Sequence, residues 1–179
     1  MAILGRGPVG PDRINGQQIE YHLTRDIAWL LEYRSFAHLY NPFMSEDRIA
    51  HAEFVITADL NGVTGGIVIA ERLWGSAAEV WSHDYPGALQ VGGLFVDQAW
   101  RKTPTAFRLG EMAAIQIAKS GRVPVAMTET RSDMSRFLNR SKAARLDRIQ
   151  YEGADCTRWD LEGLVDPVLV NTHRFAGSF

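Results

Sequence analysis

Two β-rich runs joined by Asn61-Gly62 constrain the fold of this chain more than any other feature. Both runs belong to the segment EFVITADLNGVTGGIVIAERLW, residues 53–74. An Asn-Gly pair between two such runs favours a two-residue turn, because both turn positions need a positive φ, which Asn and Gly adopt most easily. Gly65-Gly66, just after the turn, indicates a β-bulge. The segment therefore predicts a long antiparallel hairpin.

Strands and helices alternate around this hairpin. Apolar and polar residues in strand-like runs predict strands at QIEYHL (18–23), ALQVGGLFVD (88–97), VPVAMTET (123–130), DRIQYEGADCTRWDL (147–161) and PVLVNTHRF (167–175). Helical spacing and capping residues predict helices that begin near Thr24, Ser45, Thr103 and Ser132. At the third of these, Thr103 is the expected N-cap and Pro104 suits the first turn. The predicted order is β-α-α-β-β-β-α-β-α-β-β, an α/β fold with a mixed, mostly antiparallel central sheet and helices on both faces.

Length and composition point to one domain. The 179 residues are 46% hydrophobic, which supplies enough apolar surface for a sizeable core. Residues 1–18 form a Gly/Pro-rich arm that is unable to pack by itself, and residues 19–179 form the domain. We therefore expect protein partners, or self-assembly through the arm.

Several classes of protein and site are not expected. A net charge of −2 gives no general attraction to nucleic acid or to an anionic membrane. No apolar run approaches the ~20 residues of a membrane span. The N-terminus lacks the apolar core of a signal peptide, which predicts a cytoplasmic location. One cysteine and five histidines without ligand spacing predict no disulfide and no metal site.

The strand, loop and helix of GGLFVDQAWRKTPTAFRLGEMAAIQIAK, residues 92–119, resemble the central motif of the GCN5-related N-acetyltransferase (GNAT) family. That motif reads L-x-V, a few residues, and then [Q/R]-x-x-G-x-[G/A] at the start of a helix. The hairpin with its VTGG segment and the element order are also similar to that family over residues 17–175. The resemblance implies the GNAT fold and a site for acetyl-CoA.

In that family the loop N–H groups and the helix N-terminus bind the pyrophosphate of coenzyme A. The resemblance implies that the matching residues here are Arg101, Lys102, Thr103, Thr105 and Ala106. It further implies that the preceding strand holds the pantetheine, with Val91, Leu94 and Val96 beside it.

Three positions depart from the family pattern. Pro104 stands where the first loop glycine belongs, and it has no N–H to donate. Gln90 stands where many members carry a catalytic glutamate, and an amide cannot accept a proton from an amine. Many members carry a tyrosine that acts as general acid in the helix after the fifth strand. Here Phe137, Leu138 or Asn139 stands at that position, depending on register. Base, acid and phosphate loop thus all differ from those of an active member.

A second resemblance is narrower. The segment Arg136-Phe137-Leu138 is similar to an RFL segment in small GNAT-like proteins encoded among the virion genes of T7-like phages. It implies a virion-associated protein, located in the particle, if the chain is phage-encoded.

Polar residues outside the motif offer further candidates. His83-Asp84 ends the segment AEVWSHD, which is interpreted as a strand, and could relay a proton from a substrate amine, although a surface turn is favoured. Glu71 and Glu79 could bind a cationic substrate, but solvated strand ends are favoured. The six cations of residues 131–148 could bind phosphate or nucleic acid. There a solvated surface balanced by Asp133 and Asp147 is favoured.

Two functions follow. The first is a GNAT-fold protein without catalysis that serves as a structural or binding component, such as part of a phage particle. The alternative is an acetyl-CoA-dependent N-acyltransferase in which His83, or a water, deprotonates an amine.

Overall fold

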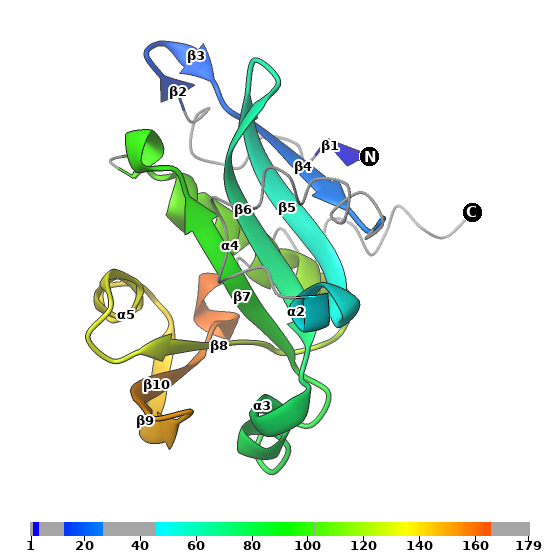
Figure 1. Cartoon of the computed structure of the whole chain (residues 1–179), viewed down its shortest axis with the longest axis vertical. Coiled ribbons are helices and arrows are strands. Elements are labelled where there is room, and N and C mark those ends of the chain that lie inside the picture. The colour runs from blue at the N-terminus through cyan, green and yellow to red at the C-terminus, as the bar shows by residue number, and fades with distance from the viewer. Residues whose placement is uncertain (1, 4–12, 27–45, 102, 166–179) are drawn as a thin grey trace. The chain divides into compact units, whose positions relative to one another are not determined.

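The computed structural model describes residues 2–3, 13–26, 46–101 and 103–165 (Figure 1). The helix expected after Thr24 and the strand expected at 167–175 lie outside these residues, apart from the first positions of that helix. The chain divides into two compact units, Met1–Arg72 with Gly92–Ala113, and Leu73–Val91 with Ala114–Phe179. Strand β7 (Leu89–Val96) and helix α4 (Thr105–Lys119) each contribute to both units.

The first unit is built on the expected hairpin. Strands β5 (Ala52–Leu60) and β6 (Val63–Arg72) pair antiparallel along their length. Asn61 and Gly62 have φ values of 52° and 78°, as the turn requires. Because Ala58 pairs with Gly66 while Asp59 pairs with Thr64, Gly65 is the extra residue of a bulge. Both the hairpin and the bulge are confirmed.

Other strands extend this sheet. The order within the unit is β1-β4-β5-β6-β7, and a separate two-stranded sheet joins β2 to β3. The short strands are β1 (Ala2–Ile3), β2 (Arg13–Ile14), β3 (Gln17–Gln18) and β4 (Glu20–Thr24). The described residues of the arm therefore pair with this same chain. Self-assembly through the arm stays a prediction.

Helices cover both faces of the first unit. A Cβ added to Gly66 would lie 2.9 Å from Leu109 of α4. Glu71, on the opposite face of the same strand, accepts a hydrogen bond from Arg48 of α2 (Glu46–Ala50) at 3.1 Å. Figure 1 shows α4 behind β6 and α2 in front of it.

The second unit continues the sheet in the order β7-β8-β10-β9. Strand β8 (Pro124–Glu129) runs parallel to Leu89–Gln90 of β7, whereas β10 (Ala154–Asp160) and β9 (Ala144–Tyr151) are antiparallel to their neighbours. On one face Trp159 packs with Leu138 of α5 (Asp133–Leu138). On the other, Trp81 of α3 (Gly75–Trp81) packs on Val125.

The predicted α/β class, with its mostly antiparallel sheet and helices on both faces, is confirmed, and three details differ. The segment at AEVWSHD ends a helix, α3, which adds one element to the predicted order. The single strand expected at 147–161 is a hairpin, β9 and β10, with a turn at Glu152-Gly153. Helix α5 ends at Leu138, whereas the segment SDMSRFLNRSKAA, residues 132–144, predicts a longer helix. No helix among the described residues is long and apolar enough to cross a membrane.

Candidate functional site

The loop after β7 is held against the bulge of the β5–β6 hairpin. The N–H of Asp97 donates to the carbonyl of Gly65 at 2.7 Å. The Asp97 carboxylate accepts the N–H of Ala99 at 2.8 Å, and this caps a 3-10 turn at Gln98–Trp100. The buried indole of Trp100 lies directly on Gly65, where an added Cβ would come within 2.2 Å of the ring. Packing against Trp100 therefore requires a residue without a side chain at position 65.

The backbone donors of this loop are used inside it. Trp100, Arg101 and Thr103 donate their N–H groups to the carbonyls three residues earlier, at 2.9, 3.4 and 3.0 Å. Thr105 donates its N–H to the hydroxyl of Thr103 at 3.3 Å. Pro104 has none to donate. Lys102 lies outside the described residues. From Ala99 to Thr105, every described N–H thus has a partner in the loop.

The polar side chains described in this loop are also engaged within it. Arg101 donates from Nε to the carbonyl of Val96 at 3.2 Å. The Thr103 hydroxyl donates its one hydrogen to the carbonyl of Trp100 at 2.6 Å. In the 2.6 Å contact between the Thr103 and Thr105 hydroxyls, Thr105 is therefore the donor. Thr105 is fully buried. Ala106 follows it, half-buried, in the first turn of α4.

These contacts do not fit a pyrophosphate site. Such a site needs N–H groups directed outward at a shared anion. Here those groups stabilise the loop itself, and helix α4 begins one residue after Pro104 rather than at it.

The strand residues expected beside pantetheine are described but not distinguished by their contacts. Val91 packs on the core of the second unit around Trp159, and Leu94 is half-buried in the first unit. Val96 is buried, and its carbonyl is the partner of Arg101. The ladder between β7 and β8 contains the pairs Leu89–Pro124 and Gln90–Val125. Their role as a cofactor site stays a prediction.

The positions of the family's base and acid have structural roles here. Gln90 is buried, and its amide oxygen accepts the indole N–H of Trp81 at 3.3 Å. Leu138 is a core residue of the second unit and Phe137 packs beside it. Asn139 is the exposed C-cap of α5. None of these side chains can donate or accept a proton in acyl transfer.

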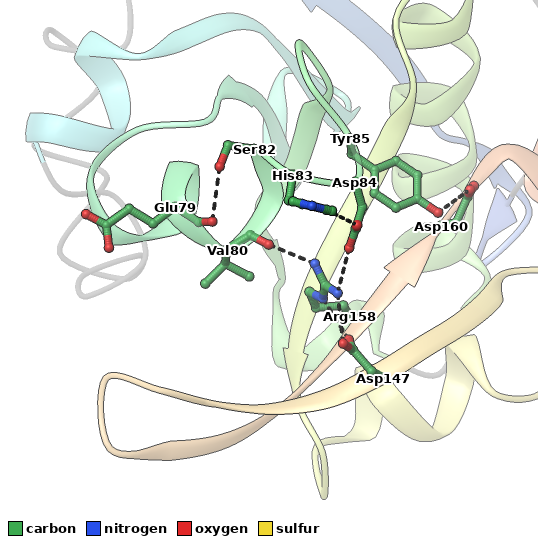
Figure 2. A network of polar contacts seen from close by, with 9 residues as sticks. All are labelled: Glu79, Val80, Ser82, His83, Asp84, Tyr85, Asp147, Arg158 and Asp160. Carbon is green, nitrogen blue, oxygen red and sulfur yellow. Dashed lines mark hydrogen bonds and ion pairs between the residues drawn. The ribbon is translucent and has the colours of Figure 1, made fainter.

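His83 and Asp84 lie together in the loop after α3, within a larger polar network (Figure 2). The His83 ring and the Asp84 carboxylate are 2.8 Å apart, and the His83 side chain is 95% exposed. Asp84 also accepts a hydrogen bond from Arg158 at 3.2 Å. The carboxylate expected to orient a catalytic histidine is therefore shared with a buried cation.

Arg158 is the centre of that network. Its guanidinium donates to both oxygens of Asp147, at 2.7 and 2.8 Å, and to the carbonyl of Val80 at 2.7 Å. The guanidinium also lies over the Trp81 ring, whose centroid is 5.0 Å away. Such a forked pair is specific in geometry and strong for a hydrogen-bonded ion pair.

The network shifts several pKa values. The hydrogen bond between Asp84 and His83 is the largest cause that lowers the pKa of Asp84, and the hydrogen bond from Arg158 is the second. Hydrogen bonds from Arg158 lower the pKa of Asp147. Burial raises the pKa of Tyr85, whose hydroxyl donates to Asp160 at 3.1 Å. The charged forms of both Asp84 and Asp147 are thus favoured, which suits their ion pairs with Arg158.

Of the two glutamates, Glu71 differs from expectation, whereas Glu79 is exposed as expected, although it lies on a helix rather than at a strand end. Glu71 is buried, not solvated, and Arg48 supplies its counter-charge. Glu79 is exposed on α3, and its side chain points away from Arg158 in Figure 2. Among the described residues no group of His, Cys, Asp and Glu could hold a metal ion.

Arg158 is the residue that sequence reasoning missed. Its signal was a cation inside the buried run CTRWD, where a charge without a partner would be costly. Its partners come from β9 and from the loop after α3, 11 and 74 residues away in sequence.

No protein-family model matches the chain, and no curated protein matches it. Solved structures do. NAA60 of Arabidopsis thaliana, in complex with acetyl-CoA, aligns with a TM-score of 0.57 at 15% identity and covers 79% of this chain and 98% of that one. Naa50 of the same plant, in complex with the bisubstrate analogue CoA-Ac-MVNAL, aligns at 0.55 and 16%, covering 79% and 96%. A Desulfovibrio desulfuricans protein described as a GNAT-family acetyltransferase aligns at 0.57 and 10%, also covering 79% and 96%. At such identities the likeness concerns the fold alone, and this chain has the GNAT fold.

Proposed function

We propose that this chain is a GNAT-fold protein that does not carry out acyl transfer and acts as a structural or binding component. The observation that carries the proposal is the closed loop at residues 97–105. From Ala99 to Thr105 its described N–H groups bond within the loop, and Pro104 has no N–H to offer a phosphate. A fold shared with acetyltransferases does not by itself imply their activity.

The residues at the catalytic positions support the same proposal. Gln90 is bound to a buried indole, and Phe137 and Leu138 pack in the core. His83, the remaining candidate base, is exposed, and its partner Asp84 is engaged by Arg158. A catalytic histidine is normally oriented by a carboxylate devoted to it.

A thermal unfolding experiment tests the proposal. A ligand that binds only the native state at about 100 times its Kd stabilises that state by about 2.7 kcal/mol. For a chain of this length that corresponds to a rise in Tm of about 5–10 °C. We expect saturating acetyl-CoA to leave the Tm of this protein unchanged.

NAA60 of Arabidopsis thaliana, which has been solved with acetyl-CoA, is a suitable positive control in the same buffer. A rise of several degrees for both proteins would reject the proposal and favour the alternative, an N-acyltransferase.

The kind of assembly is a separate matter. The resemblance to phage proteins depends on Arg136-Phe137-Leu138, and packing in the second unit accounts for the two apolar members. Arg136 pairs with Asp133 at 2.9 Å. We therefore base no function on a phage particle, and participation of the N-terminal arm in an assembly remains to be tested by sizing the protein with and without residues 1–18.

A further inference from the structure

A bulge in the outer strand of the second unit separates charges of opposite sign. Between β9 and β10 the register changes, so that Arg148 pairs with Thr157 and Arg145 pairs with Trp159. Three steps along β9 therefore match two steps along β10. Because directly paired residues share a face, Arg145 and Arg148 both project from the face of Trp159, which is the face that α5 covers.

The acidic residue between them goes to the other face. Asp147 binds Arg158, and Arg158 lies against Trp81 of α3. In a regular strand Arg145 and Asp147 would share one face, two residues apart. The bulge thus removes the one carboxylate of β9 from the neighbourhood of its two arginines.

The surrounding segment is strongly basic and exposed. Residues 131–148 contain six Arg and Lys residues and two Asp residues, which gives this segment a net charge of +4. Because the whole chain has a net charge of −2, the other 161 residues together carry −6. Apart from Arg136, none of the six has an ion pair in the described part of the chain, and all are exposed: Arg131, Arg136, Arg140, Lys142, Arg145 and Arg148. Sequence alone favoured a surface balanced by Asp133 and Asp147, but Asp147 is engaged by Arg158.

These cations continue from α5 into the edge strand. Arg140 and Lys142 lie in the loop that leads from α5 into β9, and Arg145 and Arg148 follow on the face that α5 covers. Figure 1 shows this helix and the β9–β10 hairpin at the same end of the chain's second unit. We call Arg140, Lys142, Arg145 and Arg148 the β9 basic face.

We propose that the β9 basic face binds the phosphodiester backbone of a nucleic acid. Arg donors in a fixed fork suit phosphate oxygens, and three of the four residues are Arg. Leu146, 36% exposed, is the one large exposed apolar side chain of the described part of this segment. A stable protein interface needs an apolar centre, and membrane binding is strengthened by inserted apolar residues, whereas phosphate binding needs neither. The inference is independent of whether coenzyme A binds.

Fluorescence anisotropy with a labelled duplex of mixed sequence tests it, over a series of salt concentrations. For duplex DNA, log K falls with log salt by about 0.9 for each phosphate neutralised. We expect the wild type to bind and R145A/R148A to bind more weakly, with a salt slope shallower by about 2. R145K/R148K, which keeps both charges, is expected to retain most of the slope.

R13A/R25A is the matched control, because it removes two exposed arginines of the first unit. It should leave both affinity and slope near those of the wild type. Equal weakening by R13A/R25A and R145A/R148A would overturn the proposal, as would absence of binding by the wild type at low salt. Binding to anionic phospholipid vesicles without binding to the duplex would also overturn it. Unchanged Tm values show that each variant is folded.

Discussion

Arg158 connects three parts of the second unit through one side chain. It bridges β10, where it lies, to Asp147 on β9 and to Asp84 and Val80 at the end of α3. The side chain is 10% exposed, whereas those of its two acidic partners are nearly half exposed. Water can therefore solvate the carboxylates if the cation is removed, which limits the cost but does not abolish it.

We predict that Arg158→Met lowers the free energy of unfolding by about 2 kcal/mol, between the cost of breaking a buried pair and that of a surface pair. Urea unfolding measures it. Arg148→Met on the neighbouring strand is the control, because Arg148 is exposed and unpaired among the described residues and should change stability by less than about 0.5 kcal/mol. Equal effects of the two substitutions would contradict the role given to Arg158.

The same pair predicts a pH dependence. The pKa of Asp147 is lowered in the folded protein by Arg158, below the value of about 3.9 for an unfolded chain. A lowered pKa contributes stability that is complete above the unfolded value and is lost as pH falls through the folded one. The difference in stability between wild type and Arg158→Met should thus be constant above about pH 5 and narrow below about pH 4. A difference that stays constant down to pH 2 would show that the charge of Asp147 is not involved.

At the scale of elements, the contact between the β5–β6 bulge and the loop after β7 organises the first unit. Gly65 admits the ring of Trp100, and its carbonyl accepts the N–H of Asp97. The loop is thereby fixed in a form that satisfies its own donors. The loop after β7 therefore packs on the hairpin bulge through Trp100.

A glycine substitution at this contact and one away from it are expected to change the free energy of unfolding in opposite directions. Gly65→Ala places a methyl group 2.2 Å from the Trp100 ring, and we expect it to destabilise the protein by about 3 kcal/mol. Gly110→Ala in α4 meets nothing within 4 Å and is expected to stabilise by about 0.5–1 kcal/mol through helix propensity. Thermal or urea unfolding measures both. If Gly65→Ala were neutral, the tight packing of the loop on the bulge would be wrong.

Elements with local signals could be predicted, and those that depend on distant partners could not. The hairpin follows from Asn61-Gly62, since its turn is set by two neighbouring residues. Helix α3 is not predicted, although its buried residues Ala77 and Trp81 have the i, i+4 spacing of a helix, because AEVWSHD is interpreted as a strand. The β9–β10 turn was missed because Glu152, at φ 49°, is not a residue that usually signals it.

The candidate site was predicted in position but not in contacts. The motif correctly located a loop between a strand and a helix, and it flagged Pro104 and Gln90 as departures. It could not show that the loop closes on Gly65 or that Asp84 is bound by Arg158, because both depend on residues far away in sequence.

For the whole molecule, fold and charge point to different properties. The GNAT fold is present, while Pro104 and Gln90 stand at positions where the family carries a loop glycine and a catalytic glutamate. The charge is strongly uneven, with +4 in residues 131–148 and −6 elsewhere. A binding role that depends on this basic segment needs no cofactor.

A calorimetric titration of acetyl-CoA into the full chain tests the central claim most directly, because it measures binding itself rather than its consequence for stability. We predict no saturable heat at millimolar ligand, since affinity weaker than about 1 mM corresponds to less than about 4 kcal/mol of binding free energy. A saturable isotherm with one ligand per chain and a micromolar Kd would contradict the account and return the loop at residues 97–105 to a working coenzyme site.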